Sequence, residues 1–248
     1  MPGETRAKSL FESSCSAVMT TQLPLPLALK PHARFATFVE GPNRSLITHL
    51  ESLGSGATSE VLWVWGAAGS GKSHLAQAVC AARPGQRVMY VPLATAERLA
   101  PNLLENLEDL DLIVIDDVDH VVDSPAWNRT LFNLFNDIQA ARPALLLTAK
   151  NPPGATCFRL ADLASRASAA TVYQLQALDD ADRRHALQRH AEARGLELSD
   201  AAAQYLMSRV RRDMAGLCAW LEVLDHAALA AQRKLTIPLI RATLAARS

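Results

Sequence analysis

Short apolar runs alternate with longer amphipathic stretches as far as about residue 178. Five of these apolar runs have the length and composition of buried strands, at residues 61–65, 87–91, 112–115, 144–148 and 171–175. Stretches with helical character lie before and between them, at residues 44–53, 74–80 and 126–140. Strands that alternate with helices predict an α/β fold with a parallel, doubly wound, five-stranded sheet.

The pattern changes after about residue 178, where only amphipathic helices follow. They are expected at residues 179–194, 199–209, 211–231 and 236–246. Asp179, Ser199 and Thr236 are suitable N-caps, and Gly195 is a suitable C-cap. The chain therefore divides into three expected parts, which are a flexible segment 1–34, an α/β domain 35–178 and a small all-helical domain 179–248.

The N-terminal segment begins with about 20 polar, Ser-rich residues that are predicted to be disordered, and Met19 is an alternative start. A peptide with alternating prolines follows, in which a helix is excluded and an extended backbone is favoured. Its leucines need a pocket, either on this chain or in the groove of a partner, and composition alone leaves both possibilities open. The residues concerned are Gln22, Leu23, Leu25, Pro26 and Leu27.

The bulk composition is that of a globular protein. The 248 residues are 49% hydrophobic, and 25 Lys and Arg balance 25 Asp and Glu. This balance argues against a protein whose main task is to coat nucleic acid. The first residues are not expected to be a signal peptide, because no apolar h-region follows Arg6 and Lys8. No apolar run is long enough to cross a bilayer, so a cytoplasmic protein without membrane contact is expected.

The cysteines and histidines form no recognisable site in the sequence. Cys15, Cys80 and Cys157 are scattered, as is Cys218, and no Cys or His pair has the spacing of a zinc site. His185 and His190 are interpreted as ordinary residues of a polar helix.

A glycine-rich motif follows the first predicted strand. Residues 66–73 read GAAGSGKS and fit the phosphate-binding P-loop pattern, in which backbone N–H groups and a helix N-terminus hold phosphate oxygens. Lys72 would reach the β- and γ-phosphates, and the Ser73 hydroxyl would ligate Mg²⁺. The candidate nucleotide-binding residues of this loop are Gly66, Ala67, Gly69, Ser70, Gly71, Lys72, Ser73 and His74.

Two acids end the third predicted strand, about forty residues after the P-loop. A buried strand would deliver Asp116 to the open edge of the sheet, where it can hold Mg²⁺ through water. Asp117 is the candidate for polarising the attacking water. An acidic pair at a strand end can also be a simple helix N-cap, but the P-loop upstream favours a nucleotide site.

These motifs together resemble an AAA+ ATPase of the DnaA family. Residues 35–43 look like the family's adenine-side loop, so the resemblance places Val39 and Asn43 near the base. Residues 147–153 resemble its sensor 1 strand, and residues 162–166 resemble its box VII, in which Arg166 would be an arginine finger acting in trans. The implied architecture is an AAA+ core followed by a helical lid.

The peptide at residues 22–27 is similar to the sliding-clamp-binding peptide of the Hda group within this family. This resemblance implies a protein that binds ADP or ATP with Mg²⁺ and docks on the DNA polymerase sliding clamp. It would stimulate hydrolysis of ATP bound to the initiator DnaA and so prevent re-initiation of replication. DNA would be contacted mainly through the clamp, placing the protein at the nucleoid. A homodimer is left open.

Three positions depart from the family pattern, and all three weaken the case for a vigorous intrinsic ATPase. Lys150 replaces the acid of sensor 1, Ala215 replaces the sensor 2 arginine, and Asp117 replaces the usual glutamate. Two rival hypotheses remain. One is a helicase loader or remodeller with its own ATPase cycle, and the other is a fragment of a DNA-binding initiator, for which a helix-turn-helix would be expected after the lid.

Overall fold

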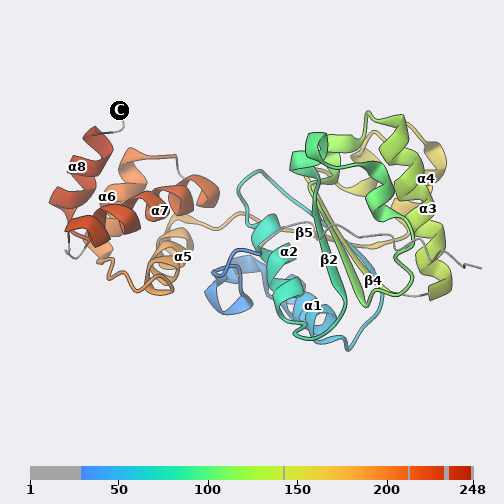
Figure 1. Ribbon diagram of the computed structural model, residues 1–248. Coiled ribbons are helices and arrows are strands. Elements are labelled where there is room, and N and C mark those ends of the chain that lie inside the picture. The colour runs from blue at the N-terminus through green and yellow to red at the C-terminus, as the bar shows by residue number, and fades with distance from the viewer. Residues whose placement is uncertain (1–28, 142, 212, 232–234, 247–248) are drawn as a thin grey trace, which may run out of the picture.

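The computed structural model describes residues 29–141, 143–211, 213–231 and 235–246. An α/β domain lies beside a group of C-terminal helices, which we call the lid (Figure 1). The strands are β1 (Val61–Trp65), β2 (Val88–Pro92), β3 (Leu112–Asp116), β4 (Ala144–Ala149) and β5 (Thr171–Gln174). The helices are α1 (Arg44–Ser55), α2 (Lys72–Ala81), α3 (Pro125–Ala141), α4 (Ala161–Ser168), α5 (Asp180–Glu192), α6 (Asp200–Arg209), α7 (Met214–Ala231) and α8 (Ile237–Ala245). The predicted clamp-binding peptide at residues 22–27 lies outside the described residues.

Within the described residues, the sheet has five strands in the order β2-β3-β4-β1-β5, and every pair of neighbours is parallel. This confirms the predicted parallel sheet. The P-loop follows the carboxyl end of β1, and Asp116 stands at the carboxyl end of β3, with β4 between the two strands. Ligands of open α/β sheets bind at this edge.

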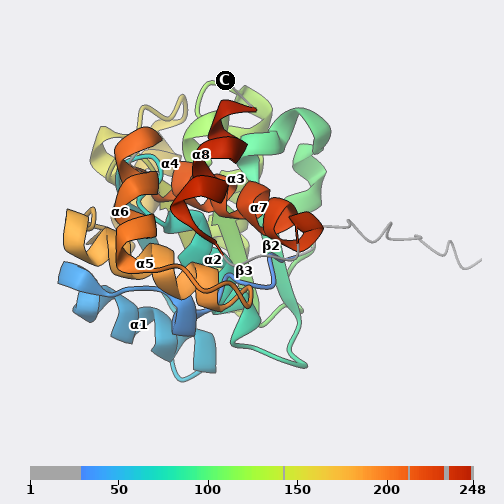
Figure 2. The same ribbon diagram turned by 90° about the vertical axis from the view of Figure 1, so that its left-hand side faces the viewer.

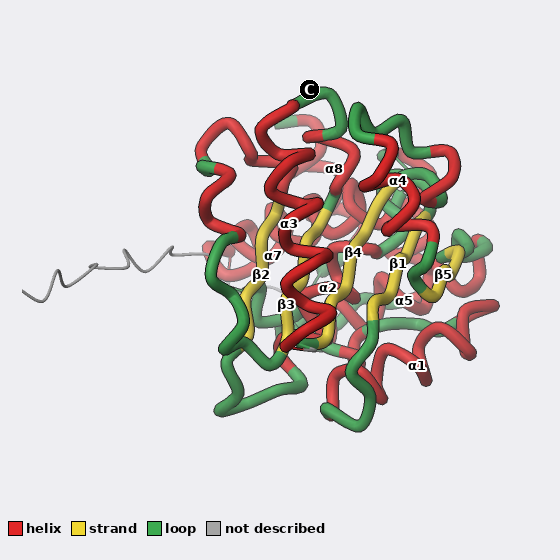
Figure 3. Tube along the Cα trace, turned by 90° about the vertical axis from the view of Figure 1, so that its right-hand side faces the viewer, coloured by secondary structure: helices red, strands yellow, loops and turns green. Residues whose placement is uncertain are grey.

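Alternate residues of the strands supply two separate cores. Trp63, Ile113 and Leu145 face the core shared with α3 and α4. Leu62 precedes Trp63, and Val114 follows Ile113. Both face the core shared with α1 and α2. Figure 3 shows α3 and α4 lying across one face of the sheet. All five residues of β3 are buried, because a parallel sheet that is covered on both faces needs apolar residues at every position.

The lid is a bundle of α5, α6, α7 and α8 with its own apolar core, seen from the front in Figure 2. Asp179 and Ser199 are N-caps as predicted, since their side chains accept hydrogen bonds from the N–H groups of Asp182 and Ala202. Helix α7 begins at Met214, three residues later than expected. Asp213 Oδ1 accepts the Gly216 N–H (2.8 Å) and so caps the helix there. None of the helices in the described ranges is both long and apolar enough to span a membrane.

Side chains from both parts join the lid to the α/β domain. The Arg189 guanidinium of α5 donates to the carbonyl oxygens of Ala36 and Phe38. Val39 packs with Leu178 and with lid residues in a small apolar cluster. The lid is therefore attached to the loop that precedes α1, and that loop lies next to the P-loop.

Arg83 ties three segments together at the opposite edge of the sheet. Its side chain is buried, and its guanidinium donates to the carbonyl oxygens of Leu53 (2.6 Å) and Asp111 (3.0 Å) and to Gln86 Oε1 (3.1 Å). These partners belong to the end of α1, the entry to β3 and the loop before β2. A buried charge is tolerated because its N–H groups are paired.

We predict that Arg83→Met lowers the free energy of unfolding by about 3 kcal/mol, because buried carbonyl groups lose their donors. Urea denaturation monitored by circular dichroism measures the change. The matched control is Arg87→Met at an exposed arginine four residues away, for which a change of at most about 0.5 kcal/mol is expected. Equal effects of the two substitutions would contradict the structural role of Arg83.

Candidate nucleotide-binding site

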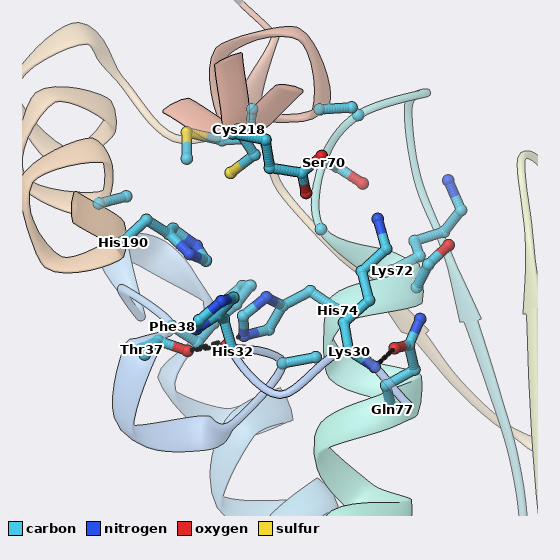
Figure 4. Close-up of a pocket in the computed structure, with 18 of the residues that line it drawn as sticks. Lys30, His32, Thr37, Phe38, Ser70, Lys72, His74, Gln77, His190 and Cys218 are labelled. Atoms are coloured by element: carbon cyan, nitrogen blue, oxygen red, sulfur yellow. Dashed lines mark hydrogen bonds between the residues drawn. The ribbon is translucent and has the colours of Figure 1, made fainter. Parts of the chain in front are cut away.

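A cleft of about 680 Å³ lies between the P-loop, the N-terminal segment and the lid. One wall consists of the P-loop and the first turns of α2, and a second wall is residues 30–39. Helices α5 and α7 supply a third wall from the lid. Figure 4 shows Lys72 and Ser70 toward one side of the cleft, while the imidazoles of His32, His74 and His190 gather toward the other.

Three P-loop positions leave no space for a Cβ, and two of them, Gly69 and Gly71, also have a positive φ. Gly71 has φ of +106°, and a Cβ there would lie 2.8 Å from the ring of Phe38. Gly69 has φ of +73°, and a Cβ there would lie 2.9 Å from Cβ of Asp213 in the lid. L-amino acids with side chains rarely adopt these φ values. The loop is therefore in close contact with both the N-terminal segment and the lid.

Lys72 is the first residue of α2 and is largely buried. Its Nζ donates to the carbonyl oxygens of Gly66 (2.8 Å) and Ala67 (3.0 Å). Burial lowers the pKa of this ammonium group, and the nearby Asp117 and Asp116 carboxylates oppose that effect. The cation is held inside the loop whose N–H groups would surround a phosphate.

Asp116 is fixed by two hydroxyl groups and is only 2% exposed. Tyr90 donates to its Oδ2 (2.8 Å), and Thr148 donates to its Oδ1. Gln77 Nε2 donates to the Tyr90 oxygen (3.3 Å), and Gln77 Oε1 accepts the Lys30 N–H (2.9 Å). A continuous chain of hydrogen bonds thus runs from the N-terminal segment to the acid predicted to hold Mg²⁺.

Asp117 adopts a left-handed backbone with φ of +57°, which is unusual for a residue other than glycine. Its N–H donates to Thr148 Oγ1 (2.9 Å), and its side chain lines the cleft next to His120 and Lys150. Burial raises the pKa of the Asp117 carboxyl group, and the Asp116 charge adds to this effect. The strained backbone turns this acid into the cleft instead of continuing the strand.

The sequence resemblance assigns position 215 of the lid to the family's sensor 2 arginine, and this residue is an uncharged alanine. Ala215 lines the cleft there. Arg211 Nε is bound to Asp213 Oδ2 (3.0 Å) at the N-terminus of α7. At sensor 1, the Lys150 N–H donates to Asp119 Oδ2 (2.7 Å) and its side chain lines the cleft. The two departures seen in the sequence therefore both face this cavity.

The structure brings most of the predicted site residues together. Those that line the cleft are Val39, Gly69, Ser70, Gly71, Lys72, Ser73, His74 and Asp117. Four others are not part of the lining, namely Gly66, Ala67, Asn43 and Asp116. Asn43 is buried. Its Oδ1 accepts the Gln176 N–H (2.8 Å), and its Nδ2 donates to the Gln176 carbonyl oxygen (3.1 Å). Its side chain thereby joins α1 to the segment that enters the lid, and its role near a base stays a prediction.

Arg166 is apart from this cleft. It lies on α4, and its guanidinium carbon is 6.0 Å from the centroid of the Phe132 ring on α3. The side chain is half-buried and does not line the cavity. It is therefore not placed to contact a nucleotide bound to its own chain.

The residues present fit a nucleotide. The Ser70 hydroxyl is buried and has no hydrogen-bond partner within the described residues, so a ligand oxygen would satisfy it. Among those residues, no group of three or more His, Cys, Asp or Glu side chains is placed to hold a metal ion. An Mg²⁺ ion here would need oxygen atoms from phosphate and water, which is its usual coordination in nucleotide sites.

Several residues that line the cleft or support its walls were not identified from the sequence. Tyr90 and Gln77 position Asp116, and Phe38 packs on the P-loop. His190, interpreted from the sequence as an ordinary polar residue, is buried in the cleft. The spacing of residues in the sequence could have identified His190. The buried positions 186, 187, 190 and 191 of α5 form one helical face.

Comparison with known proteins agrees with this architecture. The structure resembles domain III of the replication initiation protein DnaA from Thermotoga maritima, with a TM-score of 0.72, 21% identity and coverage of 88% of this chain and 97% of that one. AMPPCP-bound DnaA from Aquifex aeolicus gives a TM-score of 0.64, 21% identity and coverage of 82% and 69%. The RuvB branch-migration motor of Thermotoga maritima gives a TM-score of 0.60 and 17% identity, with coverage of 82% of this chain and 67% of that one. At these identities the likeness concerns the fold.

Two segments of the sequence match known protein families. Residues 29–170 match the bacterial DnaA ATPase domain, which is more than half of the chain. Residues 180–244 match the lid domain of Hda. The first match ends just before β5, and the second begins with α5. The chain therefore belongs to the DnaA family of AAA+ proteins, as an Hda-like member.

Proposed function

We propose that this protein inactivates the replication initiator DnaA by stimulating hydrolysis of DnaA-bound ATP, while holding an adenine nucleotide of its own. The observation that carries the proposal is the separation of two features. One is a P-loop cleft closed by the lid, and the other is an arginine, Arg166, outside that cleft. The Hda lid match supports a DnaA-related regulator. A DnaA neighbour of the same fold was solved with AMPPCP, which supports an adenine nucleotide.

In the nucleotide site, Lys72 and the N–H groups of the P-loop would bind the phosphates. Ser73 would ligate Mg²⁺ directly, and Asp116 would hold it through water, since both carboxylate oxygens already accept hydrogen bonds. Mg²⁺, when bound, would neutralise phosphate charge. The bound nucleotide would fix the lid against the P-loop and so determine the shape of the protein.

Arg166 would act on the nucleotide of DnaA. A guanidinium group placed beside a γ-phosphate stabilises the charge that develops in the transition state, and in GTPases this contribution is about 10³–10⁵-fold. The guanidinium group lies over the Phe132 ring, and this contact would restrict the side chain before it meets the partner. Such a restriction lowers the entropy lost on association. Lys150 and Ala215 would leave the protein's own site with little hydrolytic activity.

The sliding clamp is the second proposed partner, through Gln22, Leu23, Leu25, Pro26 and Leu27. Their leucines would occupy an apolar groove on the clamp in an extended conformation. DNA would be contacted mainly through the clamp, which places the protein in the cytoplasm at the nucleoid. This segment enters the described structure near Lys30, whose N–H is bound to Gln77.

We expect Arg166→Ala to bind ADP and the clamp like the wild type but to lose stimulation of ATP hydrolysis by DnaA, by about 10³-fold or to background. Hydrolysis of labelled ATP by DnaA is measured with and without DNA-loaded clamp. Arg129→Ala, at an exposed arginine of α3, serves as the control and retains stimulation. Normal stimulation by Arg166→Ala would show that the finger assignment is wrong.

Replacing Gln22 and Leu23 together by alanine is predicted to abolish capture by the immobilised clamp without changing the melting temperature. The reason is that these side chains are assigned to the partner's groove and not to this protein's own core. The measurement is a pull-down combined with thermal unfolding. A drop of several degrees with retained capture would support a linker packed on its own domain.

Tyr90→Phe is predicted to weaken the Mg²⁺-dependent part of ADP binding by about tenfold, because the phenol no longer orients Asp116. Isothermal titration with Mg²⁺ and with EDTA separates this effect from binding of the nucleotide alone, which should be unchanged in EDTA. Tyr173→Phe is the control, since that hydroxyl is bound to His49 Nδ1 (3.1 Å) on another part of the sheet. An equal loss in EDTA would argue against the positioning role.

A further inference from the structure

Three imidazole rings gather in the cleft on the side away from Lys72 (Figure 4). His190 comes from α5 in the lid, His74 from the first turn of α2, and His32 from the N-terminal segment. The rings of His74 and His190 meet edge to face, with centroids 5.2 Å apart. The Phe38 ring lies 5.6 Å from that of His74. This end of the cleft therefore has aromatic walls from separate segments.

The polar atoms of these rings are not equally satisfied. His74 Nε2 lies 2.9 Å from the carbonyl oxygen of Arg34, so this nitrogen carries the proton and donates. His190 is only 7% exposed, and its Nδ1 has no hydrogen-bond partner anywhere in the described structure. An unpaired buried polar atom costs about 1–3 kcal/mol. Neighbouring side chains cover this nitrogen, so a ligand group that displaces one of them would remove that cost.

The His190 ring is neutral at physiological pH. Burial lowers its pKa to about 4, and the neighbouring His74 and Arg194 act in the same direction. The two arginines nearest in the chain are bound to backbone carbonyl groups, Arg194 to that of His190 (2.8 Å) and Arg189 to that of Ala36. This end of the cleft thus offers a neutral hydrogen-bonding nitrogen, which suits an uncharged ligand edge better than a phosphate.

Apolar side chains also line this cleft. Val39, Leu178 and Ala186 are buried together and pack against Met214 of α7. All four line the same cleft. Arg194, Glu222 and Asp225 line the cleft as well. Aromatic and apolar walls with an unsatisfied polar atom are features that orient a flat heteroaromatic ring.

We propose that His190 reads the nucleobase, with its Nδ1 accepting a hydrogen bond from the exocyclic amino group of adenine. This inference rests on the proposed adenine nucleotide and adds the residue that selects its base. A neutral imidazole with its proton on Nε2 leaves Nδ1 as an acceptor. Guanine presents a carbonyl oxygen at the corresponding position, so two acceptors would face each other.

The position of His190 in the lid gives this contact a second consequence. A base held by α5 and phosphates held by the P-loop would bridge the two parts of the protein. A ligand shifts a conformational equilibrium only by its differential affinity for the two states. The His190 contact supplies such a difference, because it exists only when the lid lies over the cleft.

The test compares ADP with purine riboside 5′-diphosphate, which lacks only the exocyclic amino group. In isothermal titration, the wild type should bind ADP about tenfold more tightly, which corresponds to one neutral hydrogen bond of about 1.4 kcal/mol. His190→Phe keeps a flat ring but removes Nδ1, and it should bind the two ligands equally. His190→Gln restores an acceptor and should recover part of the preference. His185→Phe, at an exposed histidine of the same helix, should keep the full preference.

The outcomes separate this inference from the proposed function. Equal binding of both ligands by the wild type would overturn the role of His190. This comparison does not depend on whether any variant folds. The same holds if His190→Phe, folded by circular dichroism, keeps the wild-type preference. Failure of the wild type to bind either ligand would overturn the nucleotide site itself.

Discussion

The nucleotide site depends on the tight packing of the P-loop against the N-terminal segment and the lid. Gly69 and Gly71 have backbone angles that favour glycine, and they leave no space for a Cβ beside Asp213 of the lid and Phe38 of the N-terminal segment. Three segments that are far apart in the sequence can meet here only because these two residues lack side chains. The cleft is therefore a joint between parts of the protein as well as a phosphate cradle.

The two ends of the cleft have different electrostatic character. At the phosphate end, a buried cation lies near Asp116 and Asp117, and hydroxyl groups hold the buried carboxylate in place. Such preorganised groups strengthen electrostatic interactions with a charged ligand. At the other end, burial lowers the pKa of His190 and keeps the ring neutral. A nucleotide, which is charged at one end and heteroaromatic at the other, matches this polarity.

The site residues also suggest a division of labour between two surfaces. Lys150 and Ala215 line the cleft at the positions that the sequence resemblance assigns to sensor 1 and sensor 2. Arg166 lies outside the cleft, with its guanidinium group over the Phe132 ring. In our proposal, the nucleotide of this protein is structural, and the arginine serves the nucleotide of the partner. The chain of hydrogen bonds through Gln77 and Tyr90 would relate the metal-binding acid to the N-terminal segment.

Local pattern was sufficient for the elements and the motifs. The apolar run at residues 112–115 became β3, and the glycine-rich loop entered α2, because periodicity and backbone preference act over a few residues. Contacts between distant segments were decided only by the tertiary structure. Tyr90 meets Asp116, and Asn43 meets Gln176, through strand order and helix packing that no local pattern specifies. His190 looks like one polar residue among others in its helix. Its burial beside His74 depends on how the lid rests on the α/β domain.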